Sequence, residues 1–292
     1  MVLGPTSSGK TELALRLAKR FNGVIISADS RQIYRGLDIA TAKPTAEQQK
    51  LVPHYMIDIL EPTESFSVSL YQASVYNLLK SIVAHNTKRS RQAVPFLVGG
   101  TGLYIQAVVD GYKIPRVPAD PKLRASLDRL STARLYARLR RLDPQTTVDR
   151  HNRPRIIRAI EVHKTVGKVL PKSEAPEFDW LQIGIRHSRD ALNRRIEDKV
   201  DQMHTDGLAK EARTLAKKGY DFRLPALSAL GYTHLSSYLK GRISLREALD
   251  LMKRDTKRFA KRQMTWFKRD RRIHWVDNDA QAEALVKKFL AT

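Results

Sequence analysis

The chain has 292 residues, ordinary fractions of hydrophobic and charged residues, no cysteine and a formal net charge of +23. The lack of cysteine excludes a disulfide framework and a cysteine-rich zinc module, and no apolar run approaches the length of a membrane span. With no signal peptide before the first motif, we expect a cytoplasmic protein with no membrane partner. The basic excess lies in interior segments, which favours nucleic acid as a partner; a surface that is basic only for solubility is the alternative.

The first motif is an eight-residue segment that matches the phosphate-binding pattern G-x-x-x-x-G-K-S/T. Its residues are Gly4, Pro5, Thr6, Ser7, Ser8, Gly9, Lys10 and Thr11. We expect a short strand at 1–3 and an apolar-striped helix at 11–20 on either side. In such a loop the backbone N–H groups converge on phosphates, Lys10 binds the outer phosphates and the Thr11 hydroxyl ligates Mg²⁺. A Gly/Ser-rich turn that only caps the helix is the alternative.

A run of β-branched residues at 23–28 predicts the second parallel strand, with Asp29 at its carboxyl end. Ligands bind at the carboxyl ends of strands in open α/β sheets, so this topology places Asp29 near the phosphates. The alternative is that Asp29 caps a helix over 31–34.

The alternation of strands and helices continues, which predicts an α/β fold with a parallel sheet covered by helices on both faces. We expect strands at 54–60 and 94–98, helices at 67–84 and 103–109, and a charged turn at 87–92. The strand at 94–98 ends in Gly99-Gly100-Thr101-Gly102, so Thr101 also lies at a carboxyl end. That strand lacks the terminal acidic residue with which many nucleotide hydrolases hold Mg²⁺, which disfavours an NTPase.

After residue 114 the strand pattern stops and basic helices follow. We expect residues 1–115 to form the first part of a P-loop core, 116–150 a small helical insertion and 151–292 the rest of the core with basic C-terminal helices. The expected elements are helices at 152–166, 190–204, 208–217, 226–239, 245–268 and 279–290, strands at 180–185 and 273–276, and a loop at 170–179. The helix at 245–268 has an apolar stripe (Leu245, Leu249, Met252, Thr256, Phe259, Gln263 and Phe267). Its other faces carry basic residues with hardly any acid, which favours a face that contacts phosphate backbone over a merely solvated one.

Seven blocks in order along nearly the whole chain resemble the bacterial tRNA dimethylallyltransferase (tRNA isopentenyltransferase) family. They are 4–11, 29–34, 36–44, 99–104, 155–162, 229–232 and 261–266. The resemblance implies a P-loop core with a helical insertion that binds the anticodon arm. It also implies transfer of the dimethylallyl group of dimethylallyl diphosphate to N6 of the adenosine 3′ to the anticodon of tRNA, with Mg²⁺.

The resemblance implies roles for individual residues as well. The 4–11 loop and Arg195 would hold the diphosphate of the donor, Asp29 would orient and deprotonate the adenine amine, and Thr101 would hydrogen-bond the leaving group. The implied tRNA contacts are Asp29, Ser30, Arg31, Gln32, Thr101, Arg124, Pro154, Arg155, Ile156, Ile157, Arg158, Lys261, Arg262, Gln263, Met264, Thr265, Trp266, Phe267 and Lys268.

Ser228 and Thr233 differ from the residues that many relatives carry around the 229–232 block, so the resemblance assigns that block no tRNA contact. Two other functions fit the loop. A P-loop small-molecule kinase would need ATP and no RNA, and a nucleic-acid-binding NTPase would hydrolyse ATP when RNA is present. We expect a monomer.

Overall fold

The computed structural model describes residues 1–86, 92–115, 117–167 and 177–291. The chain folds into two compact units, which are described separately below. The first comprises Met1–Val109 and Phe178–Thr292, and the second Asp110–Glu177. The predicted turn at 87–92 and loop at 170–179 fall largely outside the described residues. No helix in the described ranges has the length and apolar character needed to cross a bilayer.

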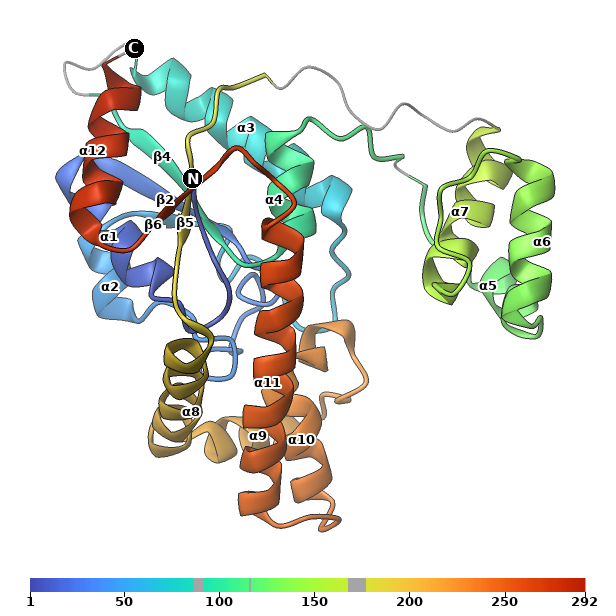
Figure 1. The fold of residues 1–292 in the computed structure, drawn as a ribbon. Coiled ribbons are helices and arrows are strands. Elements are labelled where there is room, and N and C mark those ends of the chain that lie inside the picture. Colours follow the sequence, from blue (N-terminus) through green and yellow to red (C-terminus); the bar gives the residue numbers. More distant parts are fainter. Residues whose placement is uncertain (87–91, 116, 168–176, 292) are drawn as a thin grey trace. The chain divides into compact units, whose positions relative to one another are not determined.

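Within the described residues, six strands form one parallel sheet in the order β3-β2-β4-β1-β5-β6 (Figure 1). They are β1 (Val2–Leu3), β2 (Gly23–Ala28), β3 (His54–Tyr55), β4 (Val94–Gly99), β5 (Gln182–Ile185) and β6 (Ile273–Val276). The two-residue β1 lies in the centre, where Val2 pairs with Val98 of β4 and Ile183 of β5. The predicted strand over 54–60 is wrong beyond Tyr55, because Met56 and Asp58 adopt positive φ angles that turn the chain out of the sheet.

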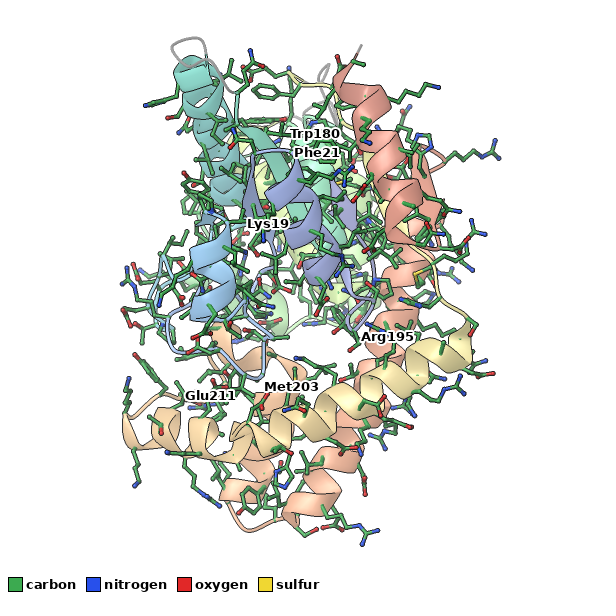
Figure 2. All side chains as sticks on the ribbon, turned by 90° about the vertical axis from the view of Figure 1, so that its left-hand side faces the viewer. Lys19, Phe21, Trp180, Arg195, Met203 and Glu211 are labelled. Carbon is green, nitrogen blue, oxygen red and sulfur yellow. The ribbon has the colours of Figure 1, made fainter. Side chains whose placement is uncertain are left out.

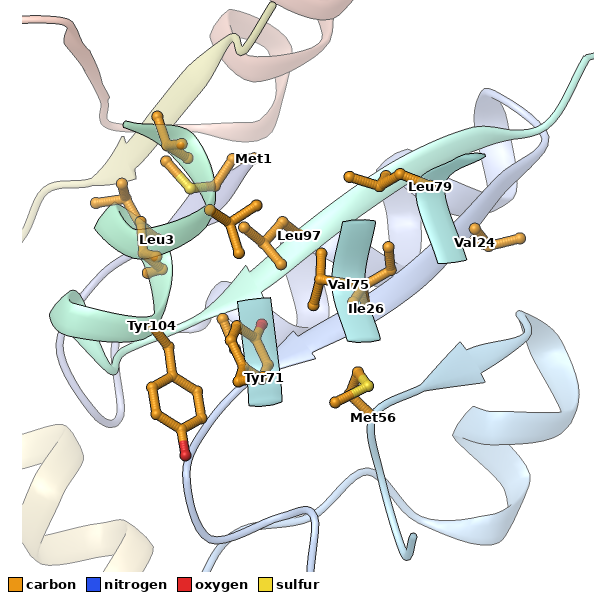
Figure 3. Packing of buried hydrophobic residues seen from close by; sticks show 14 of the residues in the cluster. Met1, Leu3, Val24, Ile26, Met56, Tyr71, Val75, Leu79, Leu97 and Tyr104 are labelled. Atoms are coloured by element: carbon orange, nitrogen blue, oxygen red, sulfur yellow. The ribbon is translucent and has the colours of Figure 1, made fainter. Parts of the chain in front are cut away.

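Helices cover both faces of this sheet, which confirms the predicted α/β class. On one face α3 (Val68–Asn86) and α4 (Gly102–Val109) pack against the sheet, and Figure 3 shows Tyr71, Val75 and Leu79 of α3 beside Ile26 and Leu97. On the other face lie α1 (Lys10–Arg20) and α12 (Asp279–Leu290). Successive residues of a strand point to opposite faces, so Ile26 joins the first cluster and Ile25 the second.

Four further helices of the first unit pack together below the carboxyl edge of the sheet as Figure 1 is drawn. They are α8 (Arg189–Thr205), α9 (Leu208–Lys217), α10 (Leu230–Leu239) and α11 (Leu245–Phe267), and the short α2 (Ala46–Leu51) lies beside α1. The helix predicted over 226–239 is divided, because Ala229 is extended between a 3₁₀ turn at Pro225–Ser228 and α10. On α11 the predicted stripe holds at Met252, Gln263 and Phe267, whereas Phe259 is exposed.

The second unit contains α5 (Pro121–Asp128), α6 (Thr132–Leu142) and α7 (Arg153–Val166). Each begins at a side-chain cap, provided by Asp120, Ser131 and Asn152. Their apolar faces share one core, formed by Leu127, Leu135, Leu139, Ile156, Ile157 and Ile160. The boundary predicted at 150/151 is therefore wrong, because α7 buries its apolar face in this unit rather than in the sheet.

Candidate active site

A cleft of about 970 Å³ opens in the first unit at the carboxyl edge of the sheet. Its walls come from the Gly4–Thr11 loop, the ends of β2 and β4, the 36–44 segment, α8 and α11. It brings together many of the residues selected from the sequence: Thr6, Ser7, Gly9, Lys10, Thr11, Asp29, Ser30, Arg31, Gln32, Thr101, Arg195, Arg262, Gln263 and Trp266. Segments far apart in sequence therefore meet where parallel strands end.

The Gly4–Thr11 loop connects β1 to α1 in the strand–loop–helix arrangement predicted for it. Gly9 has a φ of 86° and Ser7 a φ of 60°, so the backbone passes twice through the left-handed region. Gly9 also precedes α1 without capping it through a side chain. The first N–H groups of α1 therefore remain available, with the positive end of the helix dipole, for a negatively charged group in the cleft.

Two cationic side chains donate hydrogen bonds to the backbone of this loop. Lys10 Nζ donates to the Pro5 carbonyl at 3.2 Å, and Arg195 Nε of α8 donates to the Ser7 carbonyl at 2.8 Å. A Cβ on Gly9 would lie 3.2 Å from Arg195 Nη2, so the close approach of Arg195 favours glycine at position 9. Figure 2 shows Arg195 on α8, the same helix that carries Met203.

The charge on Lys10 depends on its neighbours in the cleft. Desolvation lowers the pKa of Lys10, while the negative charges of Asp29 and Glu12 act in the opposite direction. Both carboxylates therefore favour the charged form of Lys10.

Asp29 and Thr101 lie on adjacent strand ends that are tied together. The Thr101 hydroxyl accepts a hydrogen bond from Ser30 N at 3.3 Å, and Thr101 N donates to the Ala28 carbonyl at 3.3 Å. Asp29 Oδ1 accepts from Arg31 N at 2.8 Å. That bond forms a local turn, and the 31–34 segment is not helical, so the helix-cap interpretation of Asp29 is wrong.

Gln263 of α11 links the loop to the turn after β4. Its Oε1 accepts from Thr6 N at 2.9 Å and its Nε2 donates to the Gly100 carbonyl at 2.8 Å. A Cβ on Gly100 would lie 2.5 Å from Gln263 Nε2, so the contact requires glycine there. Because both ends of this buried amide are engaged, Gln263 holds the floor of the cleft together in this structure.

Gln32 is oriented just as firmly. Its Oε1 accepts from Ser27 Oγ at 2.9 Å, and its Nε2 donates to the Thr41 and Ala42 carbonyls at 3.2 Å each. The segment that provides those carbonyls contains Lys43, whose buried ammonium donates to the Tyr34 carbonyl and to the Asp38 carboxylate. Gln32 therefore lines the cleft with an amide fixed by the 36–44 segment.

Glu211 of α9, which the sequence analysis did not select, anchors that segment (Figure 2). Its carboxylate accepts from the N–H groups of Asp38, Ile39 and Ala40 at 2.8–3.2 Å and from the Tyr232 hydroxyl at 2.7 Å. Burial and the charge of Glu211 raise the pKa of Tyr232. A lone Glu on a helix carries no local signal of such a role, because all of its partners are more than 20 residues away.

The 229–232 block packs against the 36–44 segment. A Cβ on Gly231 would lie 3.2 Å from both Ala40 Cβ and Met252 Cε, so α10 packs closely here. Ser228 accepts a hydrogen bond from Arg31 Nη2 at 2.7 Å. This region shapes the cleft wall.

Near the C-terminal end of α11, one side of the helix is exposed and the other is buried. Lys261, Arg262, Thr265 and Lys268 are exposed, and Met264 and Trp266 are half-buried. Phe267 is buried in the core, and a Cβ on Gly102 would lie 2.5 Å from the Trp266 indole. A direct RNA contact by the Phe267 side chain is therefore wrong for this structure, and the exposed basic residues keep the predicted role.

The remaining selected residues belong to the second unit. Glu161, buried to 1% exposure, accepts from Asp120 N at 2.7 Å, from Arg124 at 3.0 and 2.8 Å and from Arg158 Nη1 at 2.6 Å. Burial raises the pKa of Glu161, but the hydrogen bonds from Arg124, Asp120 N and Arg158 lower it by more. The pKa of Glu161 is therefore about 2.

The other members of the 154–158 segment divide by burial. Pro154 and Arg155 are exposed, whereas Ile156 and Ile157 are buried in the core of the unit. The predicted tRNA contact by these two isoleucine side chains is therefore wrong for this structure, because apolar residues on that face of α7 pack inward.

The cleft also offers oxygen donors for a cation. The described residues contain no group of three His, Asp or Glu side chains placed to hold a metal ion. Thr11 and Asp29, however, line the same cleft and present a hydroxyl and a carboxylate. This donor set fits a hard divalent cation that takes most of its ligands from phosphate oxygens and water.

Known proteins resemble this chain over nearly its whole length. Residues 32–270 match the family model described as IPP transferase. A tRNA dimethylallyltransferase of Gloeothece citriformis is 44% identical over 285 residues, covering 96% of this chain and 91% of the relative. One of Pelotomaculum thermopropionicum is 40% identical over 301 residues, covering 99% of this chain and 94% of the relative.

A solved structure extends the likeness to the fold. The full-length tRNA isopentenylpyrophosphate transferase of Bacillus halodurans is 37% identical, with a TM-score of 0.73 over 99% of this chain and 94% of that one. By the match to the family model and by identity over nearly its whole length, the chain belongs to the IPP transferase family.

Proposed function

We propose that the protein transfers the dimethylallyl group of dimethylallyl diphosphate to N6 of the adenosine 3′ to the anticodon of tRNA, releasing diphosphate. One observation carries the proposal. In a chain whose relatives are named tRNA dimethylallyltransferase, a single cleft holds the Gly4–Thr11 loop together with Asp29 and Thr101. The relatives do not favour a small-molecule kinase.

The loop side of the cleft suits the donor. As the C1–O bond breaks, negative charge develops on the diphosphate, and Lys10, Arg195 and the N-terminal amides of α1 would stabilise it; their position around the Gly4–Thr11 loop supports this role. The Thr101 hydroxyl accepts from Ser30 N, which leaves its proton free to donate to a leaving-group oxygen. Mg²⁺, held by the Thr11 hydroxyl and the diphosphate oxygens when bound, would offset further charge on the diphosphate.

The acceptor side centres on Asp29. N6 forms the new bond to C1 while the C1–O bond breaks, and the amine proton passes to the Asp29 carboxylate. Such a base contributes roughly 10²–10⁴-fold to a rate. The adenine amine is a weak nucleophile, so its placement beside Asp29 and Gln32 is expected to matter more than its deprotonation. The base must leave its stack to reach these residues.

Basic residues supply the RNA-binding surface. The exposed cations of α11 lie beside the cleft, and Arg124, Arg155 and Arg158 give the second unit its own basic face. We propose that the protein acts as a monomer on the anticodon stem-loop. Each phosphate contact should then contribute about −0.7 to −0.9 to the slope of log affinity against log salt.

Incubation with radiolabelled dimethylallyl diphosphate and an anticodon stem-loop tests the proposal. We expect label in the RNA and a prenylated adenosine by mass. Asp29→Ala should abolish turnover while stem-loop binding stays nearly intact. ATP consumption without RNA would instead identify a kinase, and wild-type turnover by Asp29→Ala would refute the role of Asp29.

A further inference from the structure

One exposed aromatic side chain lines the cleft and has no role in the reaction described above. Among the described residues three aromatic side chains are exposed, Tyr55, Phe259 and Phe289, each to 38%. Of these three, Phe259 borders the cleft. An aromatic ring left open inside a cleft provides a large apolar face for a planar or apolar ligand.

The position of Phe259 on α11 relates it to the donor loop. It lies one helical turn before Gln263, whose amide hydrogen-bonds Thr6 N and the Gly100 carbonyl. The Arg262 guanidinium lies 5.7 Å from the centre of the Phe259 ring, and both side chains line the cleft. The helix thus presents an aromatic ring with an adjoining cation close to the proposed reaction centre.

We propose that Phe259, with Arg262 beside it, is a stacking site for the nucleobase adjacent to the acceptor adenosine. This inference rests on the proposed function. Aromatic rings and guanidinium groups are the surfaces on which proteins stack unpaired RNA bases. Withdrawal of the acceptor base from its stack leaves its neighbour with one uncovered face, which the Phe259 ring can cover.

The alternative occupant of the ring is the dimethylallyl tail of the donor. Positive charge develops on that tail as the diphosphate leaves, and the Arg262 guanidinium over the ring would oppose it. The same guanidinium attracts RNA phosphate and can itself stack on a base. The charge beside the ring therefore favours the nucleobase.

The test uses the full chain and an anticodon stem-loop that carries 2-aminopurine next to the acceptor adenosine. Stacking quenches 2-aminopurine fluorescence, so the readout does not depend on catalysis. We compare Phe259→Ala, Phe259→Leu, which keeps apolar volume without an aromatic face, and Phe259→Tyr, which keeps the ring. Phe289→Ala on α12 is the matched control, since its ring has the same exposure.

Phe259→Ala and Phe259→Leu should weaken stem-loop binding roughly 5- to 100-fold, the range of base–aromatic stacking, and lose the added quenching. Phe259→Tyr and Phe289→Ala should keep both, and the KM for dimethylallyl diphosphate should stay unchanged in all four. A rise in donor KM without a change in stem-loop affinity, or full quenching in Phe259→Leu, would overturn the inference. Failure of the wild-type chain to bind or prenylate the stem-loop would instead refute the proposed function on which it rests.

Discussion

Glu211 in the first unit and Glu161 in the second each accept four hydrogen bonds, but their donors differ. Those of Glu211 are three backbone N–H groups and a phenol, all neutral. Those of Glu161 include the guanidinium groups of Arg124 and Arg158. One carboxylate therefore fixes the course of the 36–44 segment, while the other holds two half-exposed cations with one positive charge in excess. Glu211 thus fixes the backbone of a cleft wall, whereas Glu161 fixes two charged side chains of the second unit.

Removal of Glu161 should have the largest effect on stability. Glu161→Ala leaves two guanidinium groups and the Asp120 N–H without their common partner; because the guanidinium groups are half-exposed and can bind water, we expect about 3 kcal/mol of destabilisation. Hydrogen exchange of the α7 amides should rise sharply, while amides of the central strands stay protected. Glu161→Gln is the control that keeps the side-chain volume. Unchanged protection of α7 in Glu161→Ala would contradict a central role for Glu161.

Acid should act on the second unit through the same residue. Because the pKa of Glu161 is about 2 in the folded chain and near 4.5 without its partners, its contribution to stability is complete above about pH 4.5. That contribution is lost as pH falls toward 2. Hydrogen exchange of α7 between pH 5 and 2.5 measures the loss, with Glu161→Gln as the chain that lacks this titration. Identical pH dependence in both chains would show that other carboxylates dominate.

Removal of Glu211 should destabilise the fold less than removal of Glu161 but should lower the activity more. Glu211→Ala frees the N–H groups of 38–40, which can bind water, so we expect about 2 kcal/mol of destabilisation. The Thr41 and Ala42 carbonyls that orient Gln32 would then move, and kcat with the stem-loop should fall about 10-fold or more. Tyr232→Phe removes only the phenol hydrogen bond and should cost about 1 kcal/mol. If Glu211→Ala kept the wild-type kcat, the position of the 36–44 segment would not matter for catalysis.

The smallest effect is expected at Arg155, which is exposed on α7. Arg155→Ala should leave the unfolding free energy within about 0.5 kcal/mol of wild type. If Arg155 contacts an RNA phosphate, the salt slope of stem-loop binding should decrease in magnitude by about 0.7–0.9. Arg158→Ala, which also loses its bond to Glu161, should change both quantities. An unchanged slope in Arg155→Ala would remove that residue from the RNA-binding surface.

The sequence could predict those parts of the site that local pattern determines. The Gly4–Thr11 loop, Asp29 and Thr101 follow from a motif and from strand ends, and the cleft brings them together. The roles of Glu211 and Gln263 in holding the cleft together could not be predicted in this way, because the backbone groups that they bind lie more than 150 residues away in the sequence. The membership of α7 in the second unit depends on packing against α5 and α6, which its own amphipathic pattern does not specify.

Gln263 also determines how the cleft can deform. One end of its amide holds Thr6 N and the other the Gly100 carbonyl, while the exposed Lys261, Arg262 and Lys268 lie on either side of Gln263 in the sequence. The loop and the helix therefore cannot be displaced separately without breaking one of these two bonds. A displacement of α11 that keeps both bonds would therefore carry Thr6 and Gly100 with it.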